Sequence, residues 1–405
     1  MSAEGDAAQA RPLHVFLVAG EESGDLLGAG LMRALKAGWP GTVRFSGVGG
    51  RAMAAEGLTS LFPMAEVTAI GFADVVRSLP RLLARIRETA RAAIEARPDV
   101  LVIIDSPDFT HRVARRVRAA DPRIPVVNYV SPSVWAWRPG RARAMRTYVD
   151  HVLALLPFEP AAHAELGGPP CSYVGHPLAA RASELRPDDA ERARRQQDPP
   201  VVLLLPGSRR SEVARLMVPF GQAVAKVAAE AGPLELVLPT VPHLADTVRS
   251  ATAQWPMPVR VLIDPEEKRA AFRIARAALA ASGTVTLELA LAGVPMVAAY
   301  RVGAFEAAIA RRLIRVSSVI LANLVLGENV VPELLQDDCT PERLAAALIP
   351  LLADTPARRR QCEAFARLDT IMQIGALDPD ARAAEIVLAT MQARRREPSN
   401  AVQKR

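Results

Sequence analysis

Short apolar runs alternate with longer segments rich in Ala, Leu and Arg along most of this chain of 405 residues. Strands that are apolar throughout need helices on both faces, and parallel sheets provide this arrangement. In the first half we expect strands at Leu13–Ala19, Val43–Val48, Val100–Ile104, Val126–Val130 and His151–Leu156. In the second half we expect them at Val201–Leu205, Leu234–Leu238, Val259–Ile263, Ala277–Ala281 and Pro295–Tyr300. The pattern therefore predicts an α/β fold with doubly wound sheets.

A charged stretch rich in Pro, residues 181–200, interrupts this alternation and predicts a linker between two Rossmann-like domains. We expect an N-terminal domain over residues 13–180 and a C-terminal domain over residues 201–375. Residues 1–12 are expected to form a disordered tail, and residues 376–405 a helix returning to the first domain, followed by a tail. The most economical architecture is two doubly wound domains facing each other across a cleft, with sites beyond the carboxyl ends of the strands.

Composition narrows the classes of function. The formal charge of +7 comes from Arg and hardly from Lys, a bias of the whole chain, so we discount nucleic acid as a partner. A weak attraction to anionic substrates or membrane surfaces remains open. The cysteines Cys171, Cys339 and Cys362 have no metal-binding spacing and are typical of a reducing compartment. No signal peptide and no apolar run of the ~18 residues that span a membrane are found, so we expect a cytoplasmic protein.

The first predicted strand runs into a loop with two glycines, Gly20 and Gly24, ahead of a helix expected over Leu26–Lys36. Glycine permits close backbone approach, and free N–H groups at a helix start can donate to an anion or a sugar hydroxyl. Ser23 and Asp25 lie in this loop. A tight turn in which one of them caps the helix is an equally good interpretation.

A pair of carboxylates follows the third predicted strand, at Asp105 and Asp108. A carboxylate at a strand end is well placed to act as a general base, and a second one three residues on can cap the next helix. We assign the chemistry to Asp105 and the cap to Asp108, with a helix beginning near Thr110.

Two loops in the second half have the residues of anion sites. After Val201–Leu205 come Gly207, Ser208 and Arg209, ahead of a helix expected over Ser211–Ala229. A helix start attracts phosphate, and an Arg can clamp two oxygens, although no Walker motif is present.

The second such loop, after Ala277–Ala281, contains Ser282, Gly283 and Thr284 and is followed by Glu288 one turn into a helix. A carboxylate there can accept two ribose hydroxyls, although an ordinary helix charge remains the alternative.

The run Tyr129–Trp137 holds two of the four Trp of the chain, Trp135 and Trp137, just after a predicted strand. Ser131 and Ser133 belong to the same run. Two large rings in one strand exit indicate either a ligand site or an aromatic pair packed beneath a loop, and the segment alone favours neither.

Taken together, these motifs resemble the lipid-A-disaccharide synthase family, inverting glycosyltransferases of the GT-B fold (glycosyltransferase family 19). The matching segments occur in the family's order from about residue 13 to 390: Ala19–Asp25, Ile104–Phe109, Tyr129–Trp137, Pro157–Glu159, Val174–Pro177, Leu205–Arg209, Ser282–Glu288, Pro295–Val297, Tyr300–Arg301, Asn323 and Val331–Gln336. The chain departs from the family pattern at Glu22, at Asn128 and at Val319–Ala322, and the last departure weakens the assignment of Asn323 to the nucleotide.

The resemblance implies transfer of 2,3-diacylglucosamine from UDP-2,3-diacylglucosamine to 2,3-diacylglucosamine 1-phosphate. The products are the β-1,6-linked lipid A disaccharide 1-phosphate and UDP, in lipopolysaccharide biosynthesis of a Gram-negative bacterium. It implies Asp105 as base and Arg209 on the diphosphate, with no cofactor and a mechanism that does not depend on a metal ion. His176 is the second candidate base, although a capping or core role fits it as well. Substrate contacts are further implied for His176, Asn323, Glu333 and Gln336.

Acylated substrates place such an enzyme on a membrane, here the cytoplasmic face of the inner membrane, and a homodimer is compatible with the sequence. Two basic amphipathic segments, Leu79–Ile94 and Phe305–Val325, can contact lipid. For the first, packing on the sheet is the better interpretation. For the second, packing between domains is as good.

Two other functions remain open from the sequence. One is another enzyme of this fold acting on a UDP-sugar, such as an epimerase or a cell-wall transferase, which would lack the double-Trp segment. The other is a non-catalytic nucleotide-sugar binder, which would not need Asp105.

Overall fold

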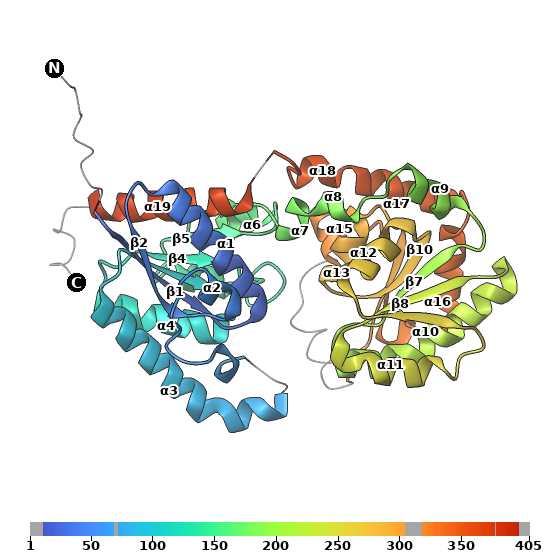
Figure 1. Ribbon diagram of the computed structural model, residues 1–405, viewed down its shortest axis with the longest axis horizontal. Helices are drawn as coiled ribbons and strands as arrows, with labels where there is room; N and C mark the ends of the chain where they lie inside the picture. Colours follow the sequence, from blue (N-terminus) through green and yellow to red (C-terminus); the bar gives the residue numbers. More distant parts are fainter. Residues whose placement is uncertain (1–10, 69–71, 304–317, 377, 397–405) are drawn as a thin grey trace, which may run out of the picture. The chain divides into compact units, whose positions relative to one another are not determined.

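The chain divides into two compact units (Figure 1). The first comprises residues 1–176 and 377–405, and the second comprises residues 177–376. The computed structural model describes residues 11–68, 72–303, 318–376 and 378–396, and for residues 72–78 the backbone alone. Most of the expected N-terminal tail therefore lies outside the described residues.

A parallel sheet with strand order β2-β1-β3-β4-β5-β6 forms the centre of the first unit. Its strands are β1 (Leu13–Ala19), β2 (Val43–Val48), β3 (Val100–Ile104), β4 (Val126–Tyr129), β5 (His151–Ala154) and β6 (Cys171–Tyr173). Neighbouring side chains of β1 point to opposite faces, so that Leu17 joins one apolar core and Val18 the other. This is why the strands are apolar along their whole length.

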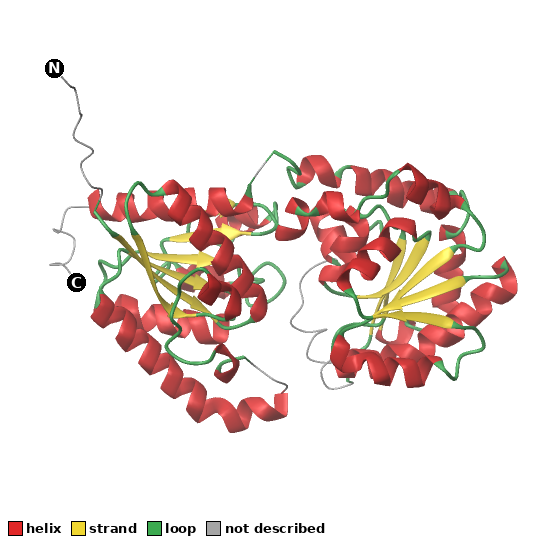
Figure 2. Ribbon diagram, viewed as in Figure 1, coloured by secondary structure: helices red, strands yellow, loops and turns green. Residues whose placement is uncertain are grey.

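Helices cover both faces of this first sheet (Figure 2). They are α1 (Glu22–Gly38), α2 (Arg51–Ala55), α3 (Phe72–Ala96), α4 (Pro107–Ala120), α5 (Gly140–Met145), α6 (Glu159–Glu165) and α19 (Pro379–Arg396), with a 3₁₀ turn at Met64–Glu66. Leu31 of α1 and Val387 of α19 are buried in one core, and Ile86 of α3 and Val113 of α4 in the other. The last helix thus packs beside α1, on the first unit.

The second unit repeats the architecture with strand order β12-β11-β10-β7-β8-β9. Its strands are β7 (Val201–Leu205), β8 (Glu235–Pro239), β9 (Val259–Leu262), β10 (Ala277–Ala281), β11 (Met296–Tyr300) and β12 (Glu333–Leu335). The strand bounds agree closely with the sequence-based ones, whereas the short edge strands β6 and β12 were not expected.

Helices also surround the second sheet. They are α7 (Pro177–Ala180), α8 (Ala182–Leu185), α9 (Asp189–Gln196), α10 (Arg210–Ala231), α11 (Ala245–Thr252), α12 (Pro265–Ile274), α13 (Thr284–Leu291), α15 (Leu321–Leu326), α16 (Pro341–Leu348), α17 (Pro356–Ala366) and α18 (Leu368–Ile371), with 3₁₀ turns at Pro242–Leu244, Gln336–Asp338 and Ile349–Leu351. Phe220 of α10 and Leu344 of α16 are fully buried with Leu204 of β7 in one core.

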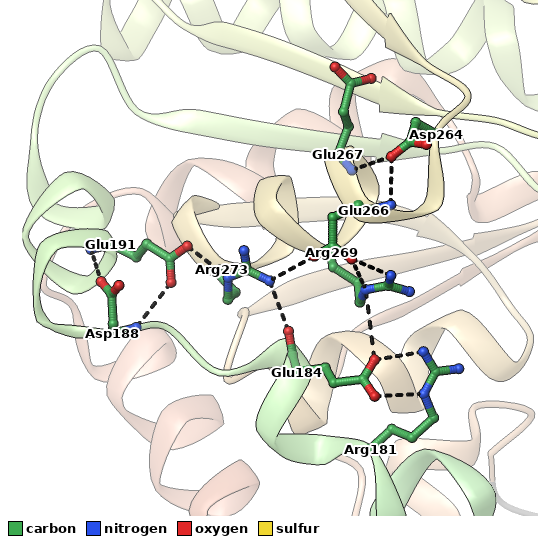
Figure 3. A network of polar contacts seen from close by, with 9 residues as sticks. All are labelled: Arg181, Glu184, Asp188, Glu191, Asp264, Glu266, Glu267, Arg269 and Arg273. Atoms are coloured by element: carbon green, nitrogen blue, oxygen red, sulfur yellow. Dashed lines mark hydrogen bonds and ion pairs between the residues drawn. The ribbon is translucent and has the colours of Figure 1, made fainter.

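The stretch over residues 181–200 is not a free linker but folds onto the second unit as α8 and α9. Figure 3 shows how ion pairs tie it to α12: Arg273 donates to Glu191 at 2.7 Å, and Arg269 lies 3.7 Å from Glu184. Arg195 is buried and donates to backbone carbonyl groups, including that of Phe272 at 3.0 Å. In the sequence this stretch has charges and no apolar periodicity, so it reads as a linker. The partners of these charges lie about 80 residues further along the chain, on α12, and cannot be recognised from the sequence.

The first of the two segments considered for lipid contact, Leu79–Ile94, lies within α3. Ile86 and Ala90 are buried against the sheet, and Arg85 pairs with Glu66 at 2.7 Å, so this helix packs on the sheet as the better interpretation had it. Most of the second segment, residues 304–317, lies outside the described residues. None of the helices described here is both long and apolar enough to cross a membrane.

Candidate active site

In the first unit the strand order reverses between β1 and β3, so the loops that follow these strands flank a switch point. Ligands of doubly wound sheets bind at such points. A Cβ on Gly20 would lie only 2.8 Å from the Cβ of Ser106, which shows how closely the two loops approach. The predicted residues Ser23 and Asp105 meet here, because the Ser23 hydroxyl donates to Asp105 Oδ2 at 3.2 Å.

Asp105 has a left-handed backbone conformation, with φ 51°, and Ser106 follows with φ 43°. Non-glycine residues pay energy for this conformation, and such residues cluster at functional sites. The loop is held by Thr110 Oγ1, which donates to the Asp105 carbonyl at 2.6 Å, and by the Asp105 amide, which donates to Tyr129 at 3.0 Å. The Asp105 side chain is partly exposed, as a base that must reach a substrate hydroxyl has to be.

Asp108 does not cap the helix after this loop. Helix α4 begins already at Pro107, and the Asp108 side chain lies in its first turn with 79% of its surface exposed. Gly24, predicted as a substrate contact, packs on β3: a Cβ there would lie 3.3 Å from the Ile104 carbonyl oxygen. Its smallness therefore serves helix–sheet packing.

Asp25 is buried and binds backbone amides of a different helix. Its carboxylate accepts from Gly50 at 2.7 Å, Ala52 at 2.8 Å and Met53 at 3.1 Å. It thus satisfies the free N–H groups at the start of α2 and not those of its own helix α1. This geometry favours a structural role over the substrate contact expected from the sequence.

The double-Trp segment is anchored by a buried carboxylate, Glu159. Trp135 Nε1 donates to Glu159 Oε1 at 3.1 Å, the Leu156 amide donates to Oε2 at 3.0 Å, and the Trp135 ring packs edge-on against Phe158. Burial, the largest influence, raises the pKa of Glu159 to about 7, although these hydrogen bonds pull it down. Trp135 therefore has a structural partner, whereas Trp137 is exposed.

A second contact ties the same segment to α6. Ser131 Oγ lies 2.8 Å from His163 Nε2, and both residues are buried. Burial lowers the pKa of His163, which favours the neutral form of the ring. Ser133 is exposed. Sequence reasoning missed His163, since one His in an Ala-rich helix carries no signal of its own.

His176, the second candidate base, is at the end of the first unit and is partly buried. Burial lowers its pKa to about 4.

The second unit contains a cavity of about 370 Å³ at its own switch point, where the order reverses between β7 and β10. The predicted residues that line it are Gly207, Ser208, Arg209, Ser282, Gly283, Thr284 and Glu288. Sequence reasoning missed three polar residues of the lining, Glu212, Thr240 and Lys268. The cavity thus joins the two loops that the sequence marked as anion sites.

The start of α10 is already occupied by a carboxylate of its own helix. Glu212 accepts from the amides of Ser208 at 3.1 Å and Arg209 at 3.2 Å, and from the Arg209 guanidinium at 2.9 Å. Gly207, at φ 110°, makes room, because a Cβ there would lie 2.3 Å from Glu212. These two amides are therefore not free for phosphate as expected, while the Arg209 side chain remains 76% exposed.

Glu288 faces the cavity and is paired across it with a cation. Lys268 Nζ donates to Glu288 Oε2 at 2.6 Å, from α12 to α13. Thr240 also lines the cavity, and its hydroxyl is, among the described residues, a buried polar atom without a hydrogen-bond partner. A buried hydroxyl of this kind is costly unless a ligand or water binds it.

Three predicted contacts lie apart from this lining. The Asn323 amide donates to Val331 at 3.0 Å and to Glu333 at 3.1 Å, and its oxygen accepts from Val330 at 3.1 Å. The Val331 amide also donates to the Asn323 oxygen, so both the nitrogen and the oxygen of the Asn323 side chain are hydrogen-bonded. The geometry of Asn323 and Glu333 therefore favours a structural role in holding α15 to β12.

Gln336 and Ser282 also bind backbone. The backbone N–H of Val302 donates to the side-chain oxygen of Gln336, and Gln336 itself has a φ of 53°. Ser282 Oγ donates to the Val319 carbonyl at 2.9 Å, which holds the segment after the undescribed residues next to the cavity. Thr284 remains exposed at the start of α13.

Across the residues that the structure describes, no three His, Cys, Asp or Glu side chains gather as metal ligands do.

Known proteins resemble this chain over almost its whole length. The model of the family described as lipid-A-disaccharide synthetase matches residues 15–387. A lipid-A-disaccharide synthase of Nitrobacter hamburgensis is 62% identical over 393 residues, which cover 97% of this chain and 99% of the relative. One of Rhodopseudomonas palustris is 63% identical over 374 residues, covering 92% and 95%.

Solved structures share the fold at low sequence identity. The MurG structure from Acinetobacter baumannii matches with a TM-score of 0.57 at 15% identity, covering 93% of this chain and all of that one. A putative UDP-N-acetylglucosamine 2-epimerase from Listeria monocytogenes matches with a TM-score of 0.58 at 13% identity, covering 96% and 98%. These likenesses support two Rossmann-like units and say nothing about the reaction.

Proposed function

The chain belongs to the lipid-A-disaccharide synthetase family and is a glycosyltransferase, and from this premise we propose its reaction and the residues that perform it. It transfers 2,3-diacylglucosamine from UDP-2,3-diacylglucosamine to 2,3-diacylglucosamine 1-phosphate. The products are UDP and a β-1,6-linked disaccharide 1-phosphate. The observation that carries this proposal on the structural side is the cavity of the second unit, with Glu288 and Lys268 facing it and Arg209 at its edge.

The cavity suits a nucleoside diphosphate. Glu288 offers carboxylate oxygens to a ribose diol, and Lys268 holds this carboxylate in place. The diphosphate has the start of α13 at Thr284 and the exposed guanidinium of Arg209 as positive partners. Glu212 already accepts from the amides of Ser208 and Arg209, just before α10, so we assign less of the phosphate binding to the start of that helix than the sequence indicated.

Asp105 supplies the base. The acceptor hydroxyl attacks the anomeric carbon of the donor sugar while Asp105 takes its proton, and the bond from that carbon to the diphosphate breaks. A single displacement of this kind inverts the anomeric configuration. The Ser23 hydroxyl orients the carboxylate, and the charge that develops on UDP is stabilised by Arg209 and the α13 start without a metal ion.

The acyl chains of both substrates place the reaction at a lipid surface, and we propose the cytoplasmic face of the inner membrane.

Product analysis with matched substrates tests the proposal. The purified chain is incubated with UDP-2,3-diacylglucosamine or UDP-N-acetylglucosamine, each with and without the diacylglucosamine 1-phosphate acceptor. UDP release and the product mass are followed. We expect UDP only from the acylated donor with acceptor, together with a disaccharide of the combined mass.

The other two functions give different results. An epimerase would convert UDP-N-acetylglucosamine to its 2-epimer without acceptor. A binding protein would retain the nucleotide sugar and release no UDP. Either result would refute the proposed transfer.

A further inference from the structure

The exposed Trp of the double-Trp segment carries two guanidinium groups. The Arg138 guanidinium carbon lies 4.3 Å from the centroid of the Trp137 ring, and that of Arg141 lies 5.7 Å from it. Trp137 is 37% exposed. We call Trp137, Arg138 and Arg141 the Trp137 patch.

Stacking leaves the hydrogen-bonding edge of a guanidinium unused. An Arg over an aromatic ring engages its π-face, while its N–H groups point outward in the plane and match the oxygens of a phosphate. Within the described residues, no carboxylate lies within ion-pair distance of Arg138, and Arg141 has only Asp108 at 3.9 Å. From residue 138 to 146 the chain has Arg at four positions and no acidic residue. The patch therefore has positive charge that the protein itself hardly neutralises.

The backbone of the patch is held in a costly conformation. Arg138 has φ 55°, in the left-handed region that a long side chain seldom adopts. Such strain is kept where the surrounding structure fixes it, and here Trp135 on Glu159 and Ser131 on His163 fix the segment. The protein thus holds Arg138 over Trp137 before any ligand binds.

The patch also lies next to the loop of the proposed base. Arg141 reaches Asp108, which is three residues beyond Asp105 in the first turn of α4. Strands β3 and β4 are neighbours, and the Asp105 amide donates to Tyr129 at the end of β4. The Trp137 patch and Asp105 therefore belong to the same edge of one sheet.

We propose that the Trp137 patch binds the phosphomonoester of the acceptor, with Arg138 and Arg141 donating to its oxygens. This inference rests on the proposed function, which supplies an acceptor with an anionic group at C1. A doubly charged phosphomonoester fits two guanidinium groups gathered over one ring, and binding it here positions the acceptor beside Asp105.

Arg138→Ala is the test, with Arg146→Ala as a matched control. Both remove one exposed Arg from the same segment, and Arg146 is outside the patch. Each is assayed with two detergent-dispersed acceptors: the 1-phosphate, and an analogue with a methoxy group in its place. Because hydrogen bonds to charged groups contribute ~1.5–3 kcal/mol, Arg138→Ala should raise the KM for the 1-phosphate about 10- to 100-fold. The KM for the donor and for the methoxy acceptor should not change, and Arg146→Ala should resemble the parent.

An equal loss toward both acceptors, or an equal effect of Arg146→Ala, would overturn the inference. Calorimetric binding of the two acceptors without donor separates it from the proposed function, since the parent should prefer the phosphate even if transfer fails. The last experiment measures binding of the parent and of Arg138→Ala to vesicles of phosphatidylcholine with and without phosphatidylglycerol. If Arg138→Ala weakens binding to the anionic vesicles alone and leaves acceptor discrimination intact, the patch binds lipid head groups and the inference is wrong.

Discussion

At the scale of single residues, the role of each carboxylate follows from the groups that already bind it. Asp25 accepts three backbone amides and is buried, whereas Asp105 contacts the Ser23 hydroxyl and its own loop and stays partly exposed. Asp25 follows a loop with two glycines, and Asp105 lies in a strained turn. The sequence marks both as candidates, and only their hydrogen-bond partners in the structure distinguish their roles. This contrast leads to the first prediction.

Asp105→Asn should keep the fold and UDP binding but lose a factor of ~10²–10⁴ in turnover, the usual effect of removing a general base. An amide preserves the shape and a hydrogen-bond acceptor for Ser23 but cannot take a proton. Asp108→Asn, with an exposed side chain on the same loop, is the control and should retain most of the activity. Turnover of Asp105→Asn within a few-fold of the parent would place the base elsewhere.

Arg209→Ala and Glu288→Ala should weaken UDP binding for different reasons. Arg209 is proposed to bind the diphosphate and Glu288 the ribose, and each charged hydrogen bond contributes ~1.5–3 kcal/mol. In calorimetry, Arg209→Ala should reduce the affinity for UDP far more than that for uridine, whereas Glu288→Ala should reduce both. Equal losses for the two ligands in both variants would contradict this assignment.

At the scale of elements, the double-Trp segment has its conformation because α6 holds it. Glu159 at the start of α6 accepts from Trp135 and from the Leu156 amide, and His163 one turn later meets Ser131. The segment that presents Trp137 and Arg138 is therefore only as well ordered as this buried cluster.

Glu159→Gln should lower the stability of the protein, and more so at pH 5 than at pH 8. Its amide nitrogen cannot accept a hydrogen bond, so one buried donor loses its partner, at a cost of ~1–3 kcal/mol. The folded state raises the pKa of Glu159 from 4.5 to about 7, so the folded protein keeps a proton that the unfolded chain releases between these values. The stabilisation from this group is thus complete below about pH 4.5 and is lost as the pH rises toward 7.

Urea unfolding at the two pH values measures this difference. The parent should lose part of its advantage over Glu159→Gln on going from pH 5 to pH 8. Glu165→Gln, exposed on the same helix, should match the parent at both. A penalty for Glu159→Gln that does not depend on pH would mean that Glu159 is ionised throughout.

At the scale of the whole molecule, the two units offer different chemistry on the same architecture. The switch point of the first has the carboxylate of Asp105, and that of the second has two cation–carboxylate pairs, Arg209–Glu212 and Lys268–Glu288, around a cavity. We expect transfer to proceed without a divalent ion, because Arg209 and the start of α13 supply the positive charge at the leaving group.

Rates measured with excess chelator and with magnesium test this expectation, using detergent-dispersed substrates so that the ion does not alter the lipids. The two rates should agree within a few-fold. Complete loss with chelator, restored by magnesium, would instead make Asp105 and Asp108 candidate metal ligands.

The sequence by itself determined the fold and the loops that carry the site. Hydrophobic periodicity is a local property, so the bounds of β1, β3, β7 and β10 could be predicted, and with them the loops at both switch points. Belonging to a glycosyltransferase family was predicted from motif order and confirmed by the family match. The short edge strands β6 and β12 were not predicted, because a strand of three residues is too short to show a hydrophobic periodicity.

Only the tertiary structure decided which polar side chains are free to act. Lys268 on Glu288 and Glu159 on Trp135 are contacts between different elements, and no spacing in the sequence indicates them. The same holds for residues 181–200, whose charges bind partners on α12. A polar residue is predicted to be functional from its type and its loop. Whether its hydrogen bonds are already used depends on groups distant in the chain, which are brought together only by folding.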